Sequence, residues 1–170
     1  MANVNHSWGG ASPEVAELET AISKMAYLLN RTRRHDWMKA ESRVPLDRAA
    51  MAVLRQLAET GPIRVGGLAE LMHVEAPHVT RQTQLLERAG YAKRVDDPED
   101  GRAQLIELTA SGRAAAKRVR EAARSGLEAA LANWSAPDLR ALSLLVSRLA
   151  EDLVADARAG DLEQRPAVAR

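Results

Sequence analysis

The stretch from Arg64 to Gly112 constrains the fold more than any other part of the chain. Apolar residues at helical spacing occur within residues 65–72, and His73-Val74 directly after them is expected to form a turn. A second helix is expected from about Pro77, because proline is well tolerated in the first turn of a helix. Gly90 is well suited to end it. Two short helices joined by a tight turn are therefore predicted.

Two strand-like runs follow the second helix, over residues 91–95 and 105–108, and the later run alternates apolar and polar side chains. Residues 97–101 read Asp-Pro-Glu-Asp-Gly, which is typical of a turn. A polar helix followed at once by a two-stranded ribbon is the arrangement of a winged helix-turn-helix. The predicted fold class is mainly α with a small β-wing.

Helical patterns also precede this stretch. Ser12 is expected to cap a helix that begins at Pro13 and runs to about Lys39, because its apolar positions step alternately by three and four residues. Asp47 is expected to cap a further helix that ends at Gly61.

A long alanine-rich helix is expected after Thr109 or Ser111, and Ser135 begins a last helix with a second heptad pattern. The predicted parts are a disordered N-terminus (1–12), an N-terminal dimerisation helix (13–44), a winged helix-turn-helix (45–112), C-terminal dimerisation helices (113–158) and a disordered tail (159–170).

Composition excludes several classes of protein. The chain has no cysteine, which rules out disulfides and thiolate metal sites. No apolar run reaches the length of about 18 residues that a membrane span needs, and the first ten residues do not resemble a secretion signal. A cytoplasmic protein is expected. The net charge of only +1 means that any DNA-binding face must come from a local arrangement of cations.

Three groups of residues together resemble the MarR family of transcriptional regulators. They are Leu46 to Gly61, then Thr80-Arg81 with Leu86-Glu87 and Gly90, then Asp97-Pro98 with Asp100-Gly101-Arg102 and Leu108-Thr109 with Gly112. The resemblance covers residues 47–112 in motif detail and the flanking helices in layout. It implies a homodimer that binds a pseudo-palindromic operator in double-stranded DNA, usually as a repressor. It also implies release by a small anionic or phenolic effector bound between the dimer arms and the DNA-reading lobes.

Residues of the second helix and the ribbon are candidates for DNA contact, together with Arg64 near the start of the helix within residues 65–72. Arginine suits guanine and phosphate, hydroxyls suit phosphate, and Pro77 could contact a thymine methyl group. The candidates are Arg64, Pro77, His78, Thr80, Arg81, Gln82, Gln84, Lys93, Arg94 and Arg102. Arg102 at the ribbon tip is the first choice for a minor-groove contact. Asp97 and Asp100 are expected to orient the wing by pairing with Arg102; alternatively, each basic residue belongs to an ordinary solvated surface. Val79, Thr83 and Leu86 are expected in the core.

The heptad patterns at the two ends predict a dimer interface formed by Leu18, Ile22, Leu142, Val146, Leu149 and Leu153. The alternative is a bundle in which these side chains pack within one chain.

The end of the first helix mixes cations with an aromatic ring and a thioether, which would suit an aromatic carboxylate. The candidate effector residues are Arg34, His35, Trp37 and Met38. The alternative is a solvated basic helix end on which Trp37 serves as a packing anchor.

No catalytic or metal-binding set is recognised. The four histidines have no metal-ligand spacing, and neither a glycine-rich phosphate loop nor a G-x-S-x-G motif is present. We therefore expect no cofactor and no enzymatic activity. The predicted function is a ligand-responsive transcriptional regulator, most simply a repressor. The alternatives are an activator, a helical scaffold whose winged helix binds protein, and a small helical enzyme.

Overall fold

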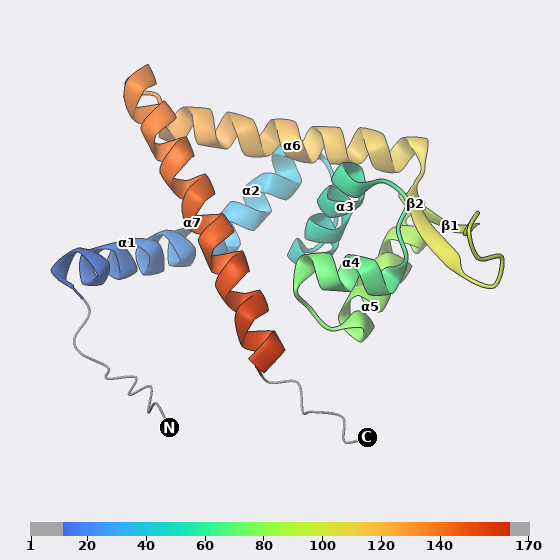
Figure 1. The fold of residues 1–170 in the computed structure, drawn as a ribbon. Helices are drawn as coiled ribbons and strands as arrows, with labels where there is room; N and C mark the ends of the chain where they lie inside the picture. The colour runs from blue at the N-terminus through green and yellow to red at the C-terminus, as the bar shows by residue number, and fades with distance from the viewer. Residues whose placement is uncertain (1–11, 164–170) are drawn as a thin grey trace, which may run out of the picture. The chain divides into compact units, whose positions relative to one another are not determined.

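A computed structural model describes residues 12–163 (Figure 1). They divide into two compact units, which meet between Gly126 and Leu127 inside one long helix. The disorder predicted for residues 1–11 and 164–170 concerns positions outside the described part of the chain.

Helices account for most of the described residues, and β1 and β2 pair as an antiparallel ribbon. The mainly helical class with a small β-wing is confirmed. The elements in chain order are α1 (Pro13–Asn30), α2 (Thr32–Ser42), α3 (Arg48–Thr60), α4 (Val65–Met72), α5 (Ala76–Arg88), β1 (Ala92–Asp96), β2 (Gln104–Leu108), α6 (Ala110–Ala130) and α7 (Ala136–Glu163).

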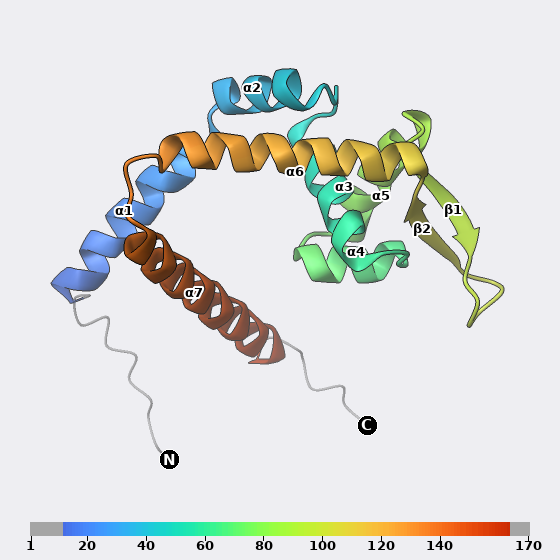
Figure 2. The same ribbon diagram turned by 90° about the horizontal axis from the view of Figure 1, so that it is seen from above.

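The helix-turn-helix and its ribbon form the centre of the first unit. Figures 1 and 2 show α3, α4 and α5 gathered together, with the β1–β2 ribbon extending away from them. The core between these elements includes Leu54 and Leu57 of α3, Leu86 of α5 and Ile106 of β2, all 2% exposed or less. Replacing one such leucine by alanine typically costs about 2–5 kcal/mol of stability. This core fixes the orientation of α5.

The predicted ends of α3 are confirmed by hydrogen bonds. The Asp47 carboxylate accepts from the backbone N–H of Ala50 at 2.7 Å, which satisfies one of the free donors of the first turn. Gly61 adopts a positive φ of 77°, which favours glycine, and its N–H donates to Leu57.

A short backbone bridge that the sequence did not indicate joins the helix-turn-helix to the ribbon. Ile63 donates to the Ile106 carbonyl at 3.2 Å and accepts from the Ile106 N–H at 2.9 Å. Because Ile63 directly precedes Arg64, this bridge places the start of α4 against the second strand of the wing.

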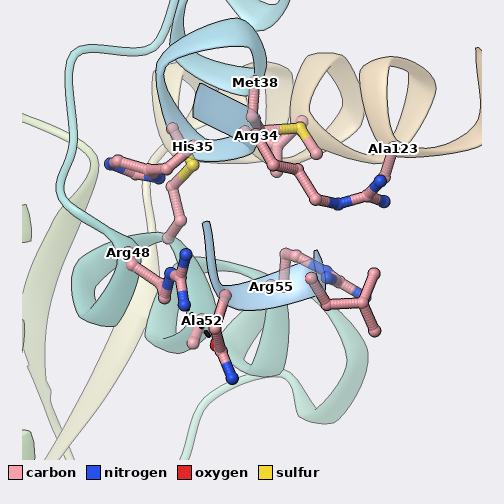
Figure 3. A pocket seen from close by; sticks show the side chains of 11 residues that line it. Arg34, His35, Met38, Arg48, Ala52, Arg55 and Ala123 are labelled. Atoms are coloured by element: carbon pink, nitrogen blue, oxygen red, sulfur yellow. Dashed lines mark hydrogen bonds between the residues drawn. The ribbon is translucent and has the colours of Figure 1, made fainter. Parts of the chain in front are cut away.

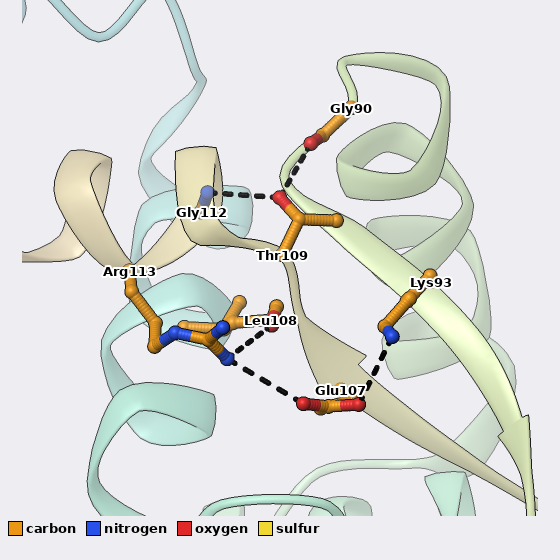
Figure 4. Close-up of polar contacts among 7 residues, drawn as sticks. All are labelled: Gly90, Lys93, Glu107, Leu108, Thr109, Gly112 and Arg113. Atoms are coloured by element: carbon orange, nitrogen blue, oxygen red, sulfur yellow. Dashed lines mark hydrogen bonds and ion pairs between the residues drawn. The ribbon is translucent and has the colours of Figure 1, made fainter.

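The junction between the ribbon and α6 depends on Thr109 and Gly112. The Thr109 hydroxyl donates to the Gly90 carbonyl at 2.7 Å and accepts from the Gly112 N–H at 3.0 Å, as Figure 4 shows. A β-carbon added to Gly112 would lie 1.9 Å from the carbonyl oxygen of Tyr91. Only glycine therefore fits at this crossing of α6 over the exit of α5.

The single helix predicted from Pro13 to about Lys39 is wrong, because the chain is extended at Arg31 with φ −65° and ψ 139°. Asn30 and Thr32 flank this residue, and both types favour helices weakly because their side chains compete for backbone hydrogen bonds. The Asn30 amide oxygen accepts a hydrogen bond from Arg48 of α3. The break makes α2 a separate helix.

The second unit consists of the end of α6 and α7. Ser135 caps α7 as predicted, with its hydroxyl accepting from the Asp138 N–H at 3.3 Å. The helix extends to Glu163, past residue 159, where the sequence predicted a disordered tail. Alanine-rich sequence sustains it there, and one Gly160 in a helix costs only about 1 kcal/mol relative to alanine.

Candidate nucleic-acid interface

The outward face of α5 carries four of the predicted contact residues. Pro77, His78, Arg81 and Gln84 are all exposed. Their spacing of three and four residues places them along one side of the helix, whereas Val79 on the opposite side is fully buried. The face is therefore ordered by the core and open to a partner.

Arg81 has the most hydrogen-bond donors of the side chains on this face. Within residues 12–163 its guanidinium takes part in no hydrogen bond or ion pair. All five of its N–H donors are available for the acceptor edge of guanine or for phosphate.

Two other predicted contacts on α5 are less exposed. Gln82 was expected on the exposed face, but it is only 5% exposed and lies on the buried face with Val79, Thr83 and Leu86. That expectation was wrong because positions 79, 82, 83 and 86 share one helix face. Thr80 is partly buried, and its hydroxyl donates to the Ala76 carbonyl at 2.9 Å within the helix. Thr83 is fully buried as predicted, with its hydroxyl donating to the Thr80 carbonyl at 2.9 Å.

The basic residues of β1 pair with carboxylates. Lys93 Nζ lies 3.4 Å from Glu107 Oε2 on β2, and Arg94 Nε donates to Glu87 Oε1 of α5 at 3.0 Å. Glu107 also pairs with Arg113, as Figure 4 shows. The side chains of Lys93 and Arg94 remain 55% and 39% exposed. Both side chains lie at the surface. To contact a phosphate, each would either bind it alongside its carboxylate partner or break that ion pair.

The two aspartates of the wing turn bind Arg64 instead of the Arg102 side chain. Arg64 Nε and Nη2 each lie 2.6 Å from Asp97 Oδ2, and Nη2 lies 3.5 Å from Asp100 Oδ2. The expectation that these carboxylates orient the guanidinium of Arg102 is therefore corrected. Asp100 instead accepts from the Arg102 backbone N–H at 3.1 Å and shapes the turn.

This arrangement stabilises the charged form of Asp97. The Glu99 N–H donates to Asp97 Oδ1 at 2.9 Å, and this bond together with the Arg64 guanidinium holds the pKa of the carboxyl below its ordinary value. The hydrogen bond from Arg64 to Asp97 and the negative charge of Asp97 raise the pKa of Arg64. Because Asp97 is only 7% exposed, it is a fixed anion inside the wing.

Arg102 is exposed at the tip of the ribbon. In the described part of the chain its guanidinium has no hydrogen-bonding or acidic partner. Arg81 and Arg102 are thus two uncompensated cations, one on the outward face of α5 and one on the ribbon beside it.

A cavity of about 280 Å³ lies in the first unit between α2, α3 and α6. Three of the predicted effector residues, Arg34, His35 and Met38, line it (Figure 3). The sequence analysis missed Arg48 and Arg55, which line it from α3. The two arginines are seven residues apart, which places them on one face of α3 about two turns apart, and this spacing was the available signal.

Trp37 does not line this cavity. Its ring packs against α6, where a β-carbon on Gly126 would lie 2.8 Å from the Cη2 atom of the indole. Trp37 therefore serves as a packing anchor, as the alternative interpretation of the sequence predicted.

The six residues predicted for a dimer interface lie on α1 and α7. Leu18 is 49%, Leu142 39%, Val146 47% and Leu153 60% exposed, and Ile22 and Leu149 are partly exposed. Each helix therefore carries apolar side chains that the described residues leave exposed.

Among the described residues, no helix is long and apolar enough to cross a membrane. In the same part of the chain, no three histidine or acidic side chains are grouped to hold a metal ion.

Comparison with known proteins gives consistent results. The sequence model of the MarR family matches residues 46–103. The uncharacterised HTH-type transcriptional regulator YxaD of Bacillus subtilis (strain 168) is 31% identical over 133 residues, which cover 78% of this chain and 87% of the relative. The regulator YdgJ of the same organism is 24% identical over 77% of this chain and 80% of its own.

Solved structures share the fold. A MarR family protein from Bacillus stearothermophilus has a TM-score of 0.74 with 23% identity, covering 85% of this chain and 99% of that one. A probable transcriptional regulator from Pseudomonas aeruginosa has a TM-score of 0.61 with 30% identity, covering 78% of this chain and 98% of that one.

Proposed function

Because the chain belongs to the MarR family of transcriptional regulators, we propose that it is a cytoplasmic repressor that binds a pseudo-palindromic operator in duplex DNA as a homodimer. The observation that carries this proposal is the exposed face of α5 beside an ordered ribbon. Arg81 on the helix and Arg102 on the ribbon are both free of acidic partners among the described residues.

On DNA, α5 occupies the major groove. Arg81 donates two hydrogen bonds to a guanine, His78 and Gln84 contact neighbouring base edges, and Pro77 packs against a thymine methyl group. Thr80 and the basic residues of β1 contact phosphate.

The ribbon supplies a second contact. Arg102 enters the adjacent minor groove, where negative potential is high when the groove is narrow. Arg64 holds the ribbon in place through Asp97 and contributes its remaining donors to phosphate.

To bind the two half-sites of a pseudo-palindromic operator, two DNA-binding lobes must be related by a two-fold axis. The exposed apolar residues of α1 and α7 pair with those of a second copy, because surfaces of this kind are seldom left open to water. The two α5 helices then reach half-sites about 10–10.5 bp apart.

A small anionic or phenolic effector releases the repressor by binding in the cavity lined by Arg34, His35 and Met38. The effector favours a conformation in which the distance between the two DNA-binding lobes does not match the operator. The coupling free energy between effector binding and DNA binding is about 1–3 kcal/mol.

Sedimentation velocity with and without operator DNA tests the dimer. Leu153→Lys places a charge at a 60% exposed seam position, so it leaves the chain folded and should yield a monomer with weakened operator binding. Ser147→Lys, at an exposed position outside the seam, is the matched control and should stay dimeric. A Leu153→Lys monomer that still binds a full operator as tightly as the wild type would overturn the two-fold arrangement.

A further inference from the structure

The cavity between α2, α3 and α6 is lined by cationic side chains. Of its eleven lining residues, three are arginines, one is a histidine and none is acidic. Arg34 projects from α2 while Arg48 and Arg55 project from α3 on the opposite side, as Figure 3 shows. Cations therefore face the same space from two helices.

These arginines are not neutralised by the surrounding chain. Arg48 donates to the uncharged amide of Asn30, and within residues 12–163 neither Arg34 nor Arg55 forms an ion pair or side-chain hydrogen bond. Three formal positive charges consequently remain without a carboxylate partner.

Apart from these cations and Asn30, the wall of the cavity is apolar. The apolar lining residues are Leu29, Met38, Met51, Ala52, Val119 and Ala123. Met51 and Val119 are 5% and 2% exposed, so part of this wall belongs to the packed interior. The volume of about 280 Å³ lies at the small end of ligand sites, which typically span about 300–1,000 Å³. It suits a molecule of one ring.

We propose that this cavity selects a single-ring ligand carrying two anionic groups, one held by Arg34 and the other by Arg55 and Arg48. The regulatory role of this cavity rests on the proposed function. Within the anionic and phenolic effectors proposed there, the cavity favours dianions, because neutral phenols and single carboxylates are poor ligands here.

The reason lies in desolvation. A ring that fills the cavity removes water from the arginines on both sides, and a charge deprived of water is costly unless it is paired. One carboxylate pairs with the arginine of one helix and leaves the other side uncompensated. A second anionic group on the far side of the ring compensates both, and each guanidinium–carboxylate pair is strengthened by parallel N–H···O bonds.

Calorimetric titration of the full chain without DNA tests this with three probes of one ring: benzamide, benzoate and benzene-1,3-dicarboxylate. We expect the dicarboxylate to bind at least about tenfold more tightly than benzoate, because it gains a second charge pair between the two helices. Benzamide should be the weakest. The dicarboxylate affinity should also fall more steeply with added salt.

Two variants locate the effect. Arg55→Gln should remove most of the difference between dicarboxylate and benzoate, and Arg34→Gln should do the same. Arg33→Gln is the matched control, since this exposed neighbour loses the same charge and does not line the cavity. All three positions are at least partly exposed, so the fold should be retained, which thermal unfolding checks.

Equal affinities for benzoate and the dicarboxylate, tighter binding of benzamide, or no binding of the dicarboxylate at millimolar concentration would each overturn the proposal. So would a charge preference that survives both Arg34→Gln and Arg55→Gln. Operator release is measured separately by a mobility shift. Selective binding without release would contradict the proposed effector role and leave the ligand class standing.

Discussion

Arg64 and Asp97 are 33 residues apart in sequence, yet two nitrogens of the guanidinium lie 2.6 Å from one oxygen of the carboxylate. Arg64 is the N-cap residue of α4, and Asp97 begins the turn of the wing. The ion pair and the adjacent Ile63–Ile106 bridge therefore join the helix-turn-helix to the ribbon by a side-chain link and a backbone link. The position of the wing therefore depends on its contacts with the start of α4 as well as on the hairpin turn.

Asp97→Asn should loosen the wing and weaken operator binding, because the amide keeps the shape of the side chain and removes its charge. An ion pair with one exposed partner is worth little, so we expect a loss of about two- to fivefold in affinity. Fluorescence anisotropy with labelled operator measures the affinity, and hydrogen exchange at the Ile106 amide reports the loosening. Asp96→Asn, at an exposed neighbouring position, is the control and should change neither.

The stability of the protein should depend on pH through Asp97. Its pKa is lowered in the folded state, so the unfolded chain takes up the proton first as the pH falls. The contribution is complete above the ordinary aspartate pKa of about 3.9 and is lost as the pH falls through the lower folded value. Urea unfolding of the wild type and Asp97→Asn should give a constant difference from pH 7 to about pH 4.5, which shrinks below about pH 4. A difference that grows on acidification would contradict this assignment.

Arg81→Ala should cost about 1–3 kcal/mol of binding free energy for the matched operator and much less for unrelated duplex DNA, because a bidentate contact to guanine is lost. Arg81→Lys keeps the charge but loses the planar fork. It should restore nonspecific binding without restoring discrimination. Competition titrations with operator and unrelated duplexes separate the two effects, and full specificity in Arg81→Lys would show that Arg81 contacts phosphate only.

Arg102→Ala should reduce the dependence of log affinity on log salt by about one unit if the ribbon tip contacts the DNA backbone. Affinity measured at a series of salt concentrations gives this slope directly. An unchanged slope together with an unchanged affinity would mean that the wing tip does not touch DNA.

Gly112→Ala should destabilise the protein by about 1–3 kcal/mol, because a methyl group 1.9 Å from the Tyr91 carbonyl oxygen forces α6 and the α5 exit apart. Gly66→Ala is the matched control. Gly66 lies inside α4 with nothing within 4 Å of an added β-carbon, so alanine should stabilise by up to about 1 kcal/mol. Urea denaturation of both variants measures the difference, and equal effects would show that the crossing at Gly112 is not tight.

The central elements were predictable because each carries its own local signal. Asp47 caps α3, Pro77 lies in the first turn of α5, and Gly90 has a φ of 74° beyond its end. Val79, Thr83 and Leu86 are fully buried as their spacing predicted. These features depend on neighbours within a few residues.

The interactions that the sequence did not reveal join distant segments. Nothing near Arg64 indicates Asp97, and the grouping of Arg34 with Arg55 depends on the break at Arg31 and on the placement of α2 and α3 on two sides of one cavity. Gln82 was misplaced because a glutamine suggests exposure, whereas helix periodicity alone puts it beside Val79 and Leu86 on the core face.

Selection from a library of random duplex DNA with the wild-type chain tests whether the α5 face binds an operator. We expect enrichment of an inverted repeat whose half-site centres lie about 10–10.5 bp apart. Binding to it should weaken steeply with added salt and lose its selectivity in Arg81→Ala. Recovery of no shared motif, or of one bound equally well by Arg81→Ala, would contradict an operator-binding function for the α5 face.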